Sequence, residues 1–308
     1  MIIDILLFIA GLAFLIKGAD YFVSGGAGLA ARFGVSPGTI GLTVIAFGTS
    51  LPEFVVSLNA LAEGSSGIAL GNIIGSNIAN IALVLAVCAI IAPAVLSCKG
   101  CLRKDPIVSD YLMMIAATVI FLVFAFFSPL GIPAGVVFLA AFAVIIYHQW
   151  KKGKTDSEKI EAHGNLDYIY IAGGIAGVVI GSRILLISAT SIAQTFGISD
   201  YVIGISMVAV GTSLPELATS LVAVVRGQHG ISIGNILGSN IFNLLFVLGV
   251  GSLVTQVPVP DYSGVLIMAG FSAAAILLFT KSKTATRAFG FVLLALYAVY
   301  IYLAFTAI

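Results

Sequence analysis

Charged residues are scarce in this sequence of 308 residues: Asp, Glu, Lys and Arg together make up 9%, against about a quarter in a typical soluble protein. Histidine and cysteine are scarce too, with 3 of each. A chain with so few polar groups could not cover its surface in water, so extramembrane enzymes, nucleic-acid-binding proteins and disulfide-stabilised scaffolds are excluded. Hydrophobic residues make up 60% instead, which predicts a membrane protein.

Ten apolar segments are each long enough to cross a bilayer as a helix, which takes about 20 residues. They are rich in Leu, Ile, Val and Ala and lack the alternation of a β-barrel, so we expect helices to satisfy the backbone in lipid. The sequence therefore predicts an all-α membrane protein with ten transmembrane helices. The expected spans are 2–31, 37–61, 66–93, 108–128, 131–150, 167–195, 201–225, 230–256, 262–281 and 286–307.

The basic residues predict how these spans are oriented. Alternate loops lie on opposite faces, and every basic residue except Lys17 and Arg183, which lie inside spans, falls on one face. Because cytoplasmic loops are enriched in Lys and Arg, this face is predicted to be cytoplasmic, with both termini outside the cell membrane. Its basic residues are Arg32, Lys99, Arg103, Lys104, Lys151, Lys152, Lys154, Lys159, Arg226, Lys281, Lys283 and Arg287.

The chain repeats itself at an offset of 163 residues. FGVSPGTIGLTVIAFGTSLPE at 33–53 corresponds to FGISDYVIGISMVAVGTSLPE at 196–216, and GNIIGSNIAN at 71–80 corresponds to GNILGSNIFN at 234–243. Each copy holds five spans, so the second copy enters the membrane from the opposite side. Such inverted repeats are typical of secondary transporters, which bind substrates near the bilayer midplane. The predicted units are a first five-helix repeat at 1–150, a cytoplasmic linker at 151–166 and a second five-helix repeat at 167–308.

Each half carries a G-T-S-L-P-E motif within its second span. Proline lacks an N–H group and crowds the carbonyl four residues earlier, so Pro52 and Pro215 are predicted to break their helices. The carbonyls freed near Gly48 and Gly211 must face protein or a water-filled cavity, because lipid cannot satisfy them. Freed carbonyls are good ligands for a hard cation.

The same motifs place one carboxylate in each broken helix. A carboxylate near the bilayer centre is costly, so Glu53 and Glu216 need a cation, a proton or a basic partner. Two glutamates would neutralise one Ca²⁺, and Na⁺ ions or protons could meet the same charges. The two residues are therefore the main candidate ligands.

Neutral oxygen ligands lie at helical spacing around the carboxylates. Residues four apart share a helix face, which pairs Thr49 with Glu53 and Ser76 with Asn80. The repeat pairs Thr212 with Glu216 and Ser239 with Asn243 in the same way. His148, His163 and His229 lie in or beside loops, so the spans offer oxygen ligands only, which select Ca²⁺, Na⁺ or Mg²⁺ over zinc or copper.

Several of these residues also have a structural interpretation. Ser, Thr and Asn commonly join membrane helices, and the G-x-x-x-G motifs at 71–75 and 234–238 are typical of close helix packing. Lys17 and Asp20, three residues apart, are expected to form a local ion pair. A pair between the halves is the alternative, because Arg183 occupies the repeat position of Asp20.

The cysteines offer a single motif. Cys98 and Cys101 form a C-x-x-C sequence in the loop after the third span. No second pair or histidine cluster joins it, so ordinary reduced thiols are expected rather than a zinc or redox site.

The paired G-T-S-L-P-E and G-N-x-x-G-S-N-I-x-N motifs resemble the two alpha repeats of the calcium:cation antiporter superfamily, in particular its prokaryotic sodium/calcium exchanger branch. The resemblance covers essentially the whole chain. It implies a central Ca²⁺ site with flanking Na⁺ sites between the second, third, seventh and eighth spans, across which the first and sixth spans slide. The implied Ca²⁺ ligands are the carboxylates of Glu53 and Glu216 and the carbonyls of Thr49 and Thr212; the Na⁺ sites share the carboxylates and add Ser50, Ser213, Ser76, Ser239 and the carbonyls of Ala46 and Ala209, with Asn80 and Asn243 closing the centre.

Two departures within this superfamily bear on the choice of ions. Related exchangers often carry an aspartate where this chain has Asn243, so the central charge here rests on the two glutamates. The proton/calcium branch has a glutamate in the G-N motif where this chain has Gly75 and Gly238. That difference favours Na⁺ as the counter-ion.

The sequence therefore predicts a secondary active antiporter that exchanges Na⁺ for Ca²⁺ by alternating access. Protons are expected to compete for the carboxylates, and no cofactor or protein partner beyond the lipid bilayer is predicted. A proton/calcium exchanger is the alternative, and a passive cation channel lined by the same oxygens is a less favoured one. An enzyme is not expected, because no substrate-entry element accompanies the carboxylates.

Overall fold

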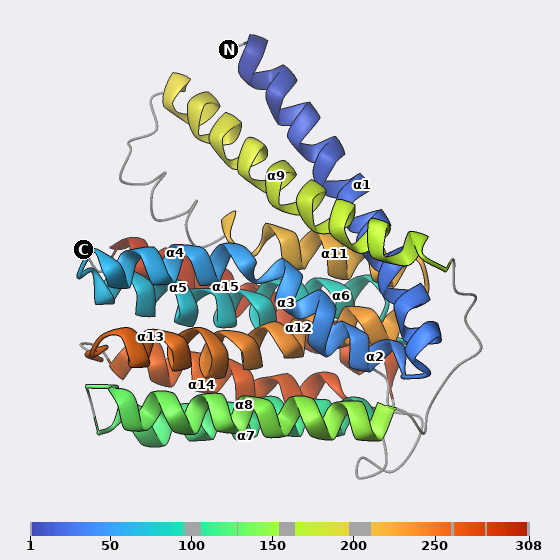
Figure 1. Ribbon diagram of the computed structural model, residues 1–308. Coiled ribbons are helices and arrows are strands. Elements are labelled where there is room, and N and C mark those ends of the chain that lie inside the picture. Colours follow the sequence, from blue (N-terminus) through green and yellow to red (C-terminus); the bar gives the residue numbers. More distant parts are fainter. Residues whose placement is uncertain are drawn as a thin grey trace.

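The computed structural model describes residues 2–94, 96, 106–127, 129–153, 164–196, 211–259, 262–280 and 282–306. Most of these residues form helices. Two long helices, α1 (Ile2–Phe33) and α9 (Leu166–Thr195), lie side by side and cross obliquely over the others, which form a layered bundle (Figure 1). The arrangement is an all-helical membrane fold.

The first half continues from α1 into a broken helix. Its first part is α2 (Pro37–Ile40), the π-helical η1 (Gly41–Ile45) and α3 (Ala46–Thr49). The second part, α4 (Leu51–Ala62), leaves at 47°. The remaining helices are α5 (Ser66–Ala79), the π-helical η2 (Asn80–Leu85), α6 (Ala86–Ile91), α7 (Pro106–Ala125) and α8 (Ile132–Gly153).

The second half follows the same order after α9. Its helices are α11 (Leu214–Val225), α12 (His229–Ile241), the π-helical η4 (Phe242–Val247), α13 (Leu248–Val254), α14 (Tyr262–Ala274), the 3₁₀-helical η5 (Ala275–Leu278) and α15 (Lys283–Thr306). The π-helical turns η2 and η4 begin one residue apart in the repeat alignment. Such turns are rare in helices and frequently lie at functional sites.

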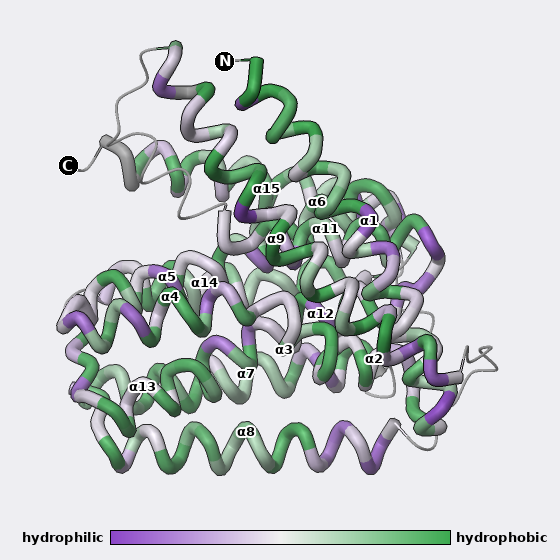
Figure 2. Tube along the Cα trace, turned by 45° about the horizontal axis from the view of Figure 1, so that its top comes forward, coloured by the Kyte–Doolittle hydropathy of each residue, from purple (hydrophilic) through white to green (hydrophobic). Residues whose placement is uncertain are grey.

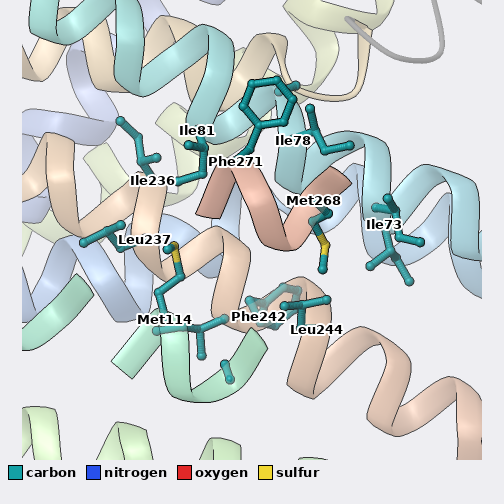
Figure 3. Packing of buried hydrophobic residues seen from close by; sticks show 14 of the residues in the cluster. Ile73, Ile78, Ile81, Met114, Ile236, Leu237, Phe242, Leu244, Met268 and Phe271 are labelled. Atoms are coloured by element: carbon teal, nitrogen blue, oxygen red, sulfur yellow. The ribbon is translucent and has the colours of Figure 1, made fainter. Parts of the chain in front are cut away.

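The two helices that carry the G-N motifs form the centre of the bundle. Apolar side chains of α5, α7, α12 and α14 pack between them (Figure 3). The outer helices bury much less of their surface and expose apolar side chains, as lipid-facing helices do. Figure 2 shows α8 as hydrophobic along most of its length and hydrophilic near one end. The asparagine and serine side chains of the G-N segments are therefore buried inside the bundle.

The predicted spans correspond to described helices. Among the described residues, seven helices are long and apolar enough to cross a membrane, and the bent pair before and after Ser50 makes up to eight. The shorter apolar helices Leu214–Val225 and Tyr262–Leu278 fall within the predicted seventh and ninth spans. Residues 197–210, which include the start of the seventh span, lie outside the described part of the chain, as do Cys98 and Cys101. The count of ten spans stays a prediction.

Three local expectations are corrected. Thr49 ends α3 and Glu53 lies in the first turn of α4, so the bend at Ser50 separates two residues that were expected on one helix face. Helix α8 continues to Gly153, beyond the end of the span expected at 131–150, because its last turn packs on the start of α2, where Ser36 N donates to Gly153 O over 3.0 Å.

The third correction concerns Asp20. Its carboxylate pairs with Arg226 over 2.5 Å, and within the described residues no ion pair joins it to Lys17 or Arg183. The reason is packing: α1 runs along α11, which brings Asp20 to the guanidinium group that follows α11, whereas the side chain of Lys17 is exposed.

Helices α1 and α9 meet along a seam of glycines. A Cβ atom at Gly18 would lie 2.5 Å from the backbone nitrogen of Val178, and one at Gly174 would lie 2.6 Å from the backbone of Phe22. Only glycine permits backbones to approach so closely in a membrane. The seam joins α1 and α9 into one unit that lies across the bundle (Figure 1).

Candidate cation site

The site forms where the G-T-S-L-P-E helices break. Ser50 lies outside helical geometry at the bend, and Pro52 occupies the first turn of α4. Ser213 and Pro215 have the same places before and within α11. Both prolines thus lie in a first helical turn, where a missing N–H costs nothing. Glu53 and Glu216 lie in the first turns of α4 and α11, where the positive end of the helix dipole favours negative charge.

Glu53 and Glu216 are both fully buried, at 0% exposure. Neither oxygen of Glu53 and only one oxygen of Glu216 has a hydrogen-bond partner. Their carboxyl groups are close enough to interact electrostatically. In the part of the chain that the structure describes, no basic side chain pairs with either. Burial of two carboxyl groups without a basic partner is costly, which leaves a cation or a proton to stabilise them.

Two serine hydroxyl groups donate hydrogen bonds to one carboxylate oxygen of Glu216. Ser50 Oγ donates to Glu216 Oε1 over 2.8 Å, so a residue of the first repeat bonds the carboxylate of the second. Ser239 Oγ donates to the same oxygen over 3.4 Å. Ser213, the repeat equivalent of Ser50, is buried and its hydroxyl has no hydrogen-bond partner. The two halves therefore contribute the same residue types in different arrangements.

The threonines also bridge the repeats. Thr49 Oγ1 donates to Asn235 Oδ1 over 2.9 Å, and it lies 3.4 Å from Ser239 Oγ. Thr212 Oγ1 lies 3.2 Å from Ser76 Oγ, which places one hydroxyl group from each half side by side. These contacts close the polar layer between α3, α5, α11 and α12.

Asn80 and Asn243 complete this layer. Both are fully buried at the π-helical turns, and the side-chain oxygen of each has no hydrogen-bond partner. Their amide nitrogens are bonded across the repeats, to Asn240 Oδ1 and Asn77 Oδ1 respectively. Two buried amide oxygens thus stay free for a ligand, which is the chemistry that a hard cation requires.

The structure brings most of the predicted ligands together. Hydrogen bonds join Glu216 to Ser50 and Ser239, Ser239 to Thr49, and Ser76 to Thr212, whereas the side chains of Glu53 and Ser213 are buried without a hydrogen-bond partner. Ala46 is also present, and its carbonyl accepts from Ser50 N over 3.0 Å and from Thr49 Oγ1 over 3.3 Å. Ala209 lies outside the described residues. Among described residues, no cluster of three or more His, Cys, Asp and Glu exists, so two carboxylates and neutral oxygens form the candidate site.

Sequence reasoning missed the residues that support the site. Asn72 Nδ2 donates to Glu53 O over 3.2 Å and to Ser57 Oγ over 2.9 Å. Asn235 makes the equivalent bonds to Glu216 O over 3.5 Å and to Ser220 Oγ over 3.0 Å. Each asparagine thereby ties the G-N helix to the start of its glutamate helix. Their repetition in both G-N motifs was the available signal.

Comparison with known proteins places this geometry in a family. A family model described as sodium/calcium exchanger protein matches residues 3–151 and 166–306. The chain is 36% identical over 305 residues to an uncharacterized membrane protein, MJ0091, of Methanocaldococcus jannaschii, with 97% of each chain covered. It is 31% identical over 306 residues to the sodium/calcium exchanger MaX1 of Methanosarcina acetivorans, with 85% of this chain and 86% of the relative covered.

A solved structure agrees with this family over the whole fold. The sodium-calcium exchanger NCX_Mj, soaked with 2.5 mM Na⁺ and 0.1 mM Ca²⁺, superimposes with a TM-score of 0.81 at 36% identity, and the match covers 98% of each chain. Family model, relatives and fold therefore agree, and the chain belongs to the sodium/calcium exchanger protein family.

Proposed function

We propose that this protein is a secondary active antiporter that exchanges Na⁺ for Ca²⁺ across the cell membrane. One observation carries the proposal: two fully buried carboxylates, one from each repeat, start broken helices and retain three oxygens without hydrogen-bond partners. The family and the match to NCX_Mj support the same activity.

The ligands follow from the oxygen groups of this layer. The carboxylates of Glu53 and Glu216 and the carbonyls of Thr49 and Thr212 would hold Ca²⁺. The Na⁺ sites would share the carboxylates and add Ser50, Ser213, Ser76, Ser239 and the carbonyls of Ala46 and Ala209, and Asn80 and Asn243 would face the centre. All of these groups are oxygens, which suits both ions.

Charge couples the two ions. Two buried carboxylates cannot stay uncompensated in a low-dielectric site, so Ca²⁺ leaves when Na⁺ ions replace its charge. Protons would compete for the same oxygens. Because Asn243 is neutral, the described site carries two negative charges, which one Ca²⁺ neutralises.

Alternating access would come from α1 and α9. Their shared glycine seam makes them a unit distinct from the bundle that holds the glutamates (Figure 1). In this proposal ten helices form two inverted repeats, the basic face is cytoplasmic, and both termini lie outside. Sliding of α1 and α9 over the bundle would expose the site to one side at a time.

The test uses purified protein in sealed proteoliposomes. An outward Na⁺ gradient should drive uptake of radiolabelled Ca²⁺, and Glu53→Gln or Glu216→Gln should abolish it. Na⁺-driven Ca²⁺ uptake that persists in both variants would refute the assignment of Glu53 and Glu216 as ligands of the transported ions.

Matched gradients separate the alternatives. A pH gradient alone, without Na⁺, should drive little Ca²⁺ movement; strong uptake under that condition would indicate a proton/calcium exchanger. Ca²⁺ flux down its own gradient without any counter-ion would indicate a channel.

A further inference from the structure

Four asparagine side chains form a closed network across the two repeats. Asn77, Asn80, Asn240 and Asn243 are at most 1% exposed. Asn77 Nδ2 donates to the backbone oxygen of Asn240 over 3.3 Å, and Asn240 Nδ2 donates to the backbone oxygen of Asn77 over 3.4 Å. Asn80 Nδ2 donates to Asn240 Oδ1 over 3.0 Å, and Asn243 Nδ2 donates to Asn77 Oδ1 over 3.1 Å. Each of these four bonds has its repeat equivalent, and Asn240 Nδ2 also donates to Met114 Sδ over 3.6 Å.

The network fixes which end of each amide faces which neighbour. A backbone carbonyl only accepts, so the amide nitrogen of Asn77 must point at the carbonyl of Asn240. The oxygen of Asn77 is then the group that meets Asn243, which must present its nitrogen in return. The oxygen of Asn243 is left free and buried. The same sequence of constraints leaves the oxygen of Asn80 free.

We propose that Asn77 and Asn240 are positioning residues that turn the amide oxygens of Asn243 and Asn80, rather than their NH₂ groups, toward the transported cation. This inference rests on the proposed function. An amide with no fixed partner presents oxygen or nitrogen with similar ease, and an NH₂ group facing a cation is repulsive. Asn77 and Asn240 touch no ion themselves; they act through Asn243 and Asn80.

The proposal predicts a specific coupling between positions 77 and 243. Aspartate at position 243 has oxygen at both ends and no donor when ionised, so it would oppose the oxygen of Asn77. If Asn77 is replaced by leucine, this conflict disappears, and an aspartate no longer needs a partner to present oxygen. One substitution should therefore correct the other.

The experiment is a double-mutant cycle of Asn77→Leu and Asn243→Asp, with the KM for Ca²⁺ measured in Na⁺-driven uptake. Loss of a residue that orients a metal ligand typically weakens metal affinity about 10- to 100-fold, so Asn77→Leu should raise KM by that order. The double variant should have a lower KM than Asn77→Leu alone. The mirror cycle of Asn240→Leu and Asn80→Asp should give the same pattern.

Each outcome decides the proposal. Additive effects in both cycles, or an unchanged KM in Asn77→Leu and Asn240→Leu, would overturn it while wild-type uptake still supports the exchanger. Failure of all variants to fold would show that the asparagines are structural only, which also overturns it. Absence of Na⁺-driven uptake in the wild type would instead refute the proposed function.

A second, independent observation concerns ion pairs at the two ends of the bundle. Asp20 of α1 pairs with Arg226, just after α11, and Arg226 also donates to Ser24. The repeat offset of 163 residues carries Asp20 to Arg183 of α9 and carries Arg226 back to Glu63, just after α4. Both positions are therefore acidic in the first half and basic in the second, so each of the two possible pairs joins an acid of the first half to an arginine of the second.

Only one of these two pairs is formed in the described structure. Helix α1 packs along α11, whereas α9 has no comparable packing on α4. Glu63 and Arg183 are both exposed and unpaired with each other. Arg183 instead lines a cavity of about 670 Å³ between α4 and α9 that reaches Pro52 and Thr212, beside the two helix breaks.

We infer that the two pairs form alternately, Asp20–Arg226 when α1 is closed on α11 and Glu63–Arg183 when α9 is closed on α4. This also rests on the proposed function, because it assigns one pair to each access state. Inverted repeats exchange their conformations between states, so a contact made by one half should be made by the other half in the opposite state.

Charge exchange tests the unformed pair. Glu63→Arg should slow Na⁺-driven Ca²⁺ uptake by about two- to fivefold, the scale of an exposed pair, and Glu63→Arg combined with Arg183→Glu should restore it. Asp20→Arg with Arg226→Asp is the matched cycle for the formed pair. Normal uptake in Glu63→Arg, or no recovery in its double variant, would overturn the inference, whereas an inactive wild type would again refute the proposed function.

Discussion

Glu53→Gln should separate Ca²⁺ binding from Na⁺ binding. The substitution keeps the shape of a fully buried side chain whose two oxygens have no hydrogen-bond partner, so it removes charge and little else. Two unit charges about 4 Å apart at an effective dielectric constant of about 20 interact by about 4 kcal/mol. Ca²⁺ therefore loses about 8 kcal/mol of attraction, while the ion-free site loses about 4 kcal/mol of repulsion between the glutamates.

The net loss for Ca²⁺ is about 4 kcal/mol, or about 1000-fold in affinity. A single Na⁺ loses about as much attraction as the site loses repulsion, so its affinity should change little. Equilibrium binding of radiolabelled Ca²⁺ and Na⁺ to the purified protein measures both. Asp4→Asn, in the first turn of α1, is the matched control. A fall of less than about tenfold for Ca²⁺, or an equal fall for both ions, would refute the reasoning.

Three further predictions concern the Na⁺ ligands, the seam and protons. Ser50→Ala should raise the Na⁺ concentration that half-inhibits Ca²⁺ uptake about fivefold, since one neutral ligand is worth roughly 1 kcal/mol. An unchanged half-inhibiting concentration would argue against Ser50 as a Na⁺ ligand. Gly174→Ala should lower the Tm and the rate of Ca²⁺ uptake, because its Cβ atom would lie 2.6 Å from the backbone of Phe22. Gly173→Ala is the control, since a Cβ atom there would have nothing within 4 Å. Equal Tm values and uptake rates in the two variants would contradict a tightly packed seam between α1 and α9. Lowering the pH should raise the KM for Ca²⁺ without lowering the maximal rate, because protons compete for the glutamates; a fall in the maximal rate alone would exclude competition.

Much of the fold follows from sequence patterns that act locally. Apolar segments of sufficient length must become helices in lipid, because no other open structure satisfies their backbone. Pro52 and Pro215 lie in first helical turns, as their missing N–H groups predict. The expected continuous face from Thr49 to Glu53 was wrong, because a helix that restarts at Leu51 resets the rotation of every residue after it.

The candidate site was predictable only in part. A carboxylate in a membrane span is conspicuous in the sequence because burying its charge in lipid costs free energy. The repetition of the two glutamates at a fixed offset identifies them as candidate ligands without a structure. The supporting amides do not stand out in this way. Asn72 and Asn235 resemble ordinary helix-joining residues until their bonds to the backbone oxygens of Glu53 and Glu216 are seen.

The sequence by itself determined membrane residence, the repeat, the broken helices and the two buried carboxylates, because hydropathy and proline act within a few residues. Only the tertiary structure decided which side chains of the two halves contact each other: Ser50 donates a hydrogen bond to Glu216, and Asp20 pairs with Arg226 rather than with Lys17. These choices depend on how α1 and α9 lie across the bundle. Two nearly equivalent halves permit more than one such packing, and their shared motifs cannot specify which packing is formed.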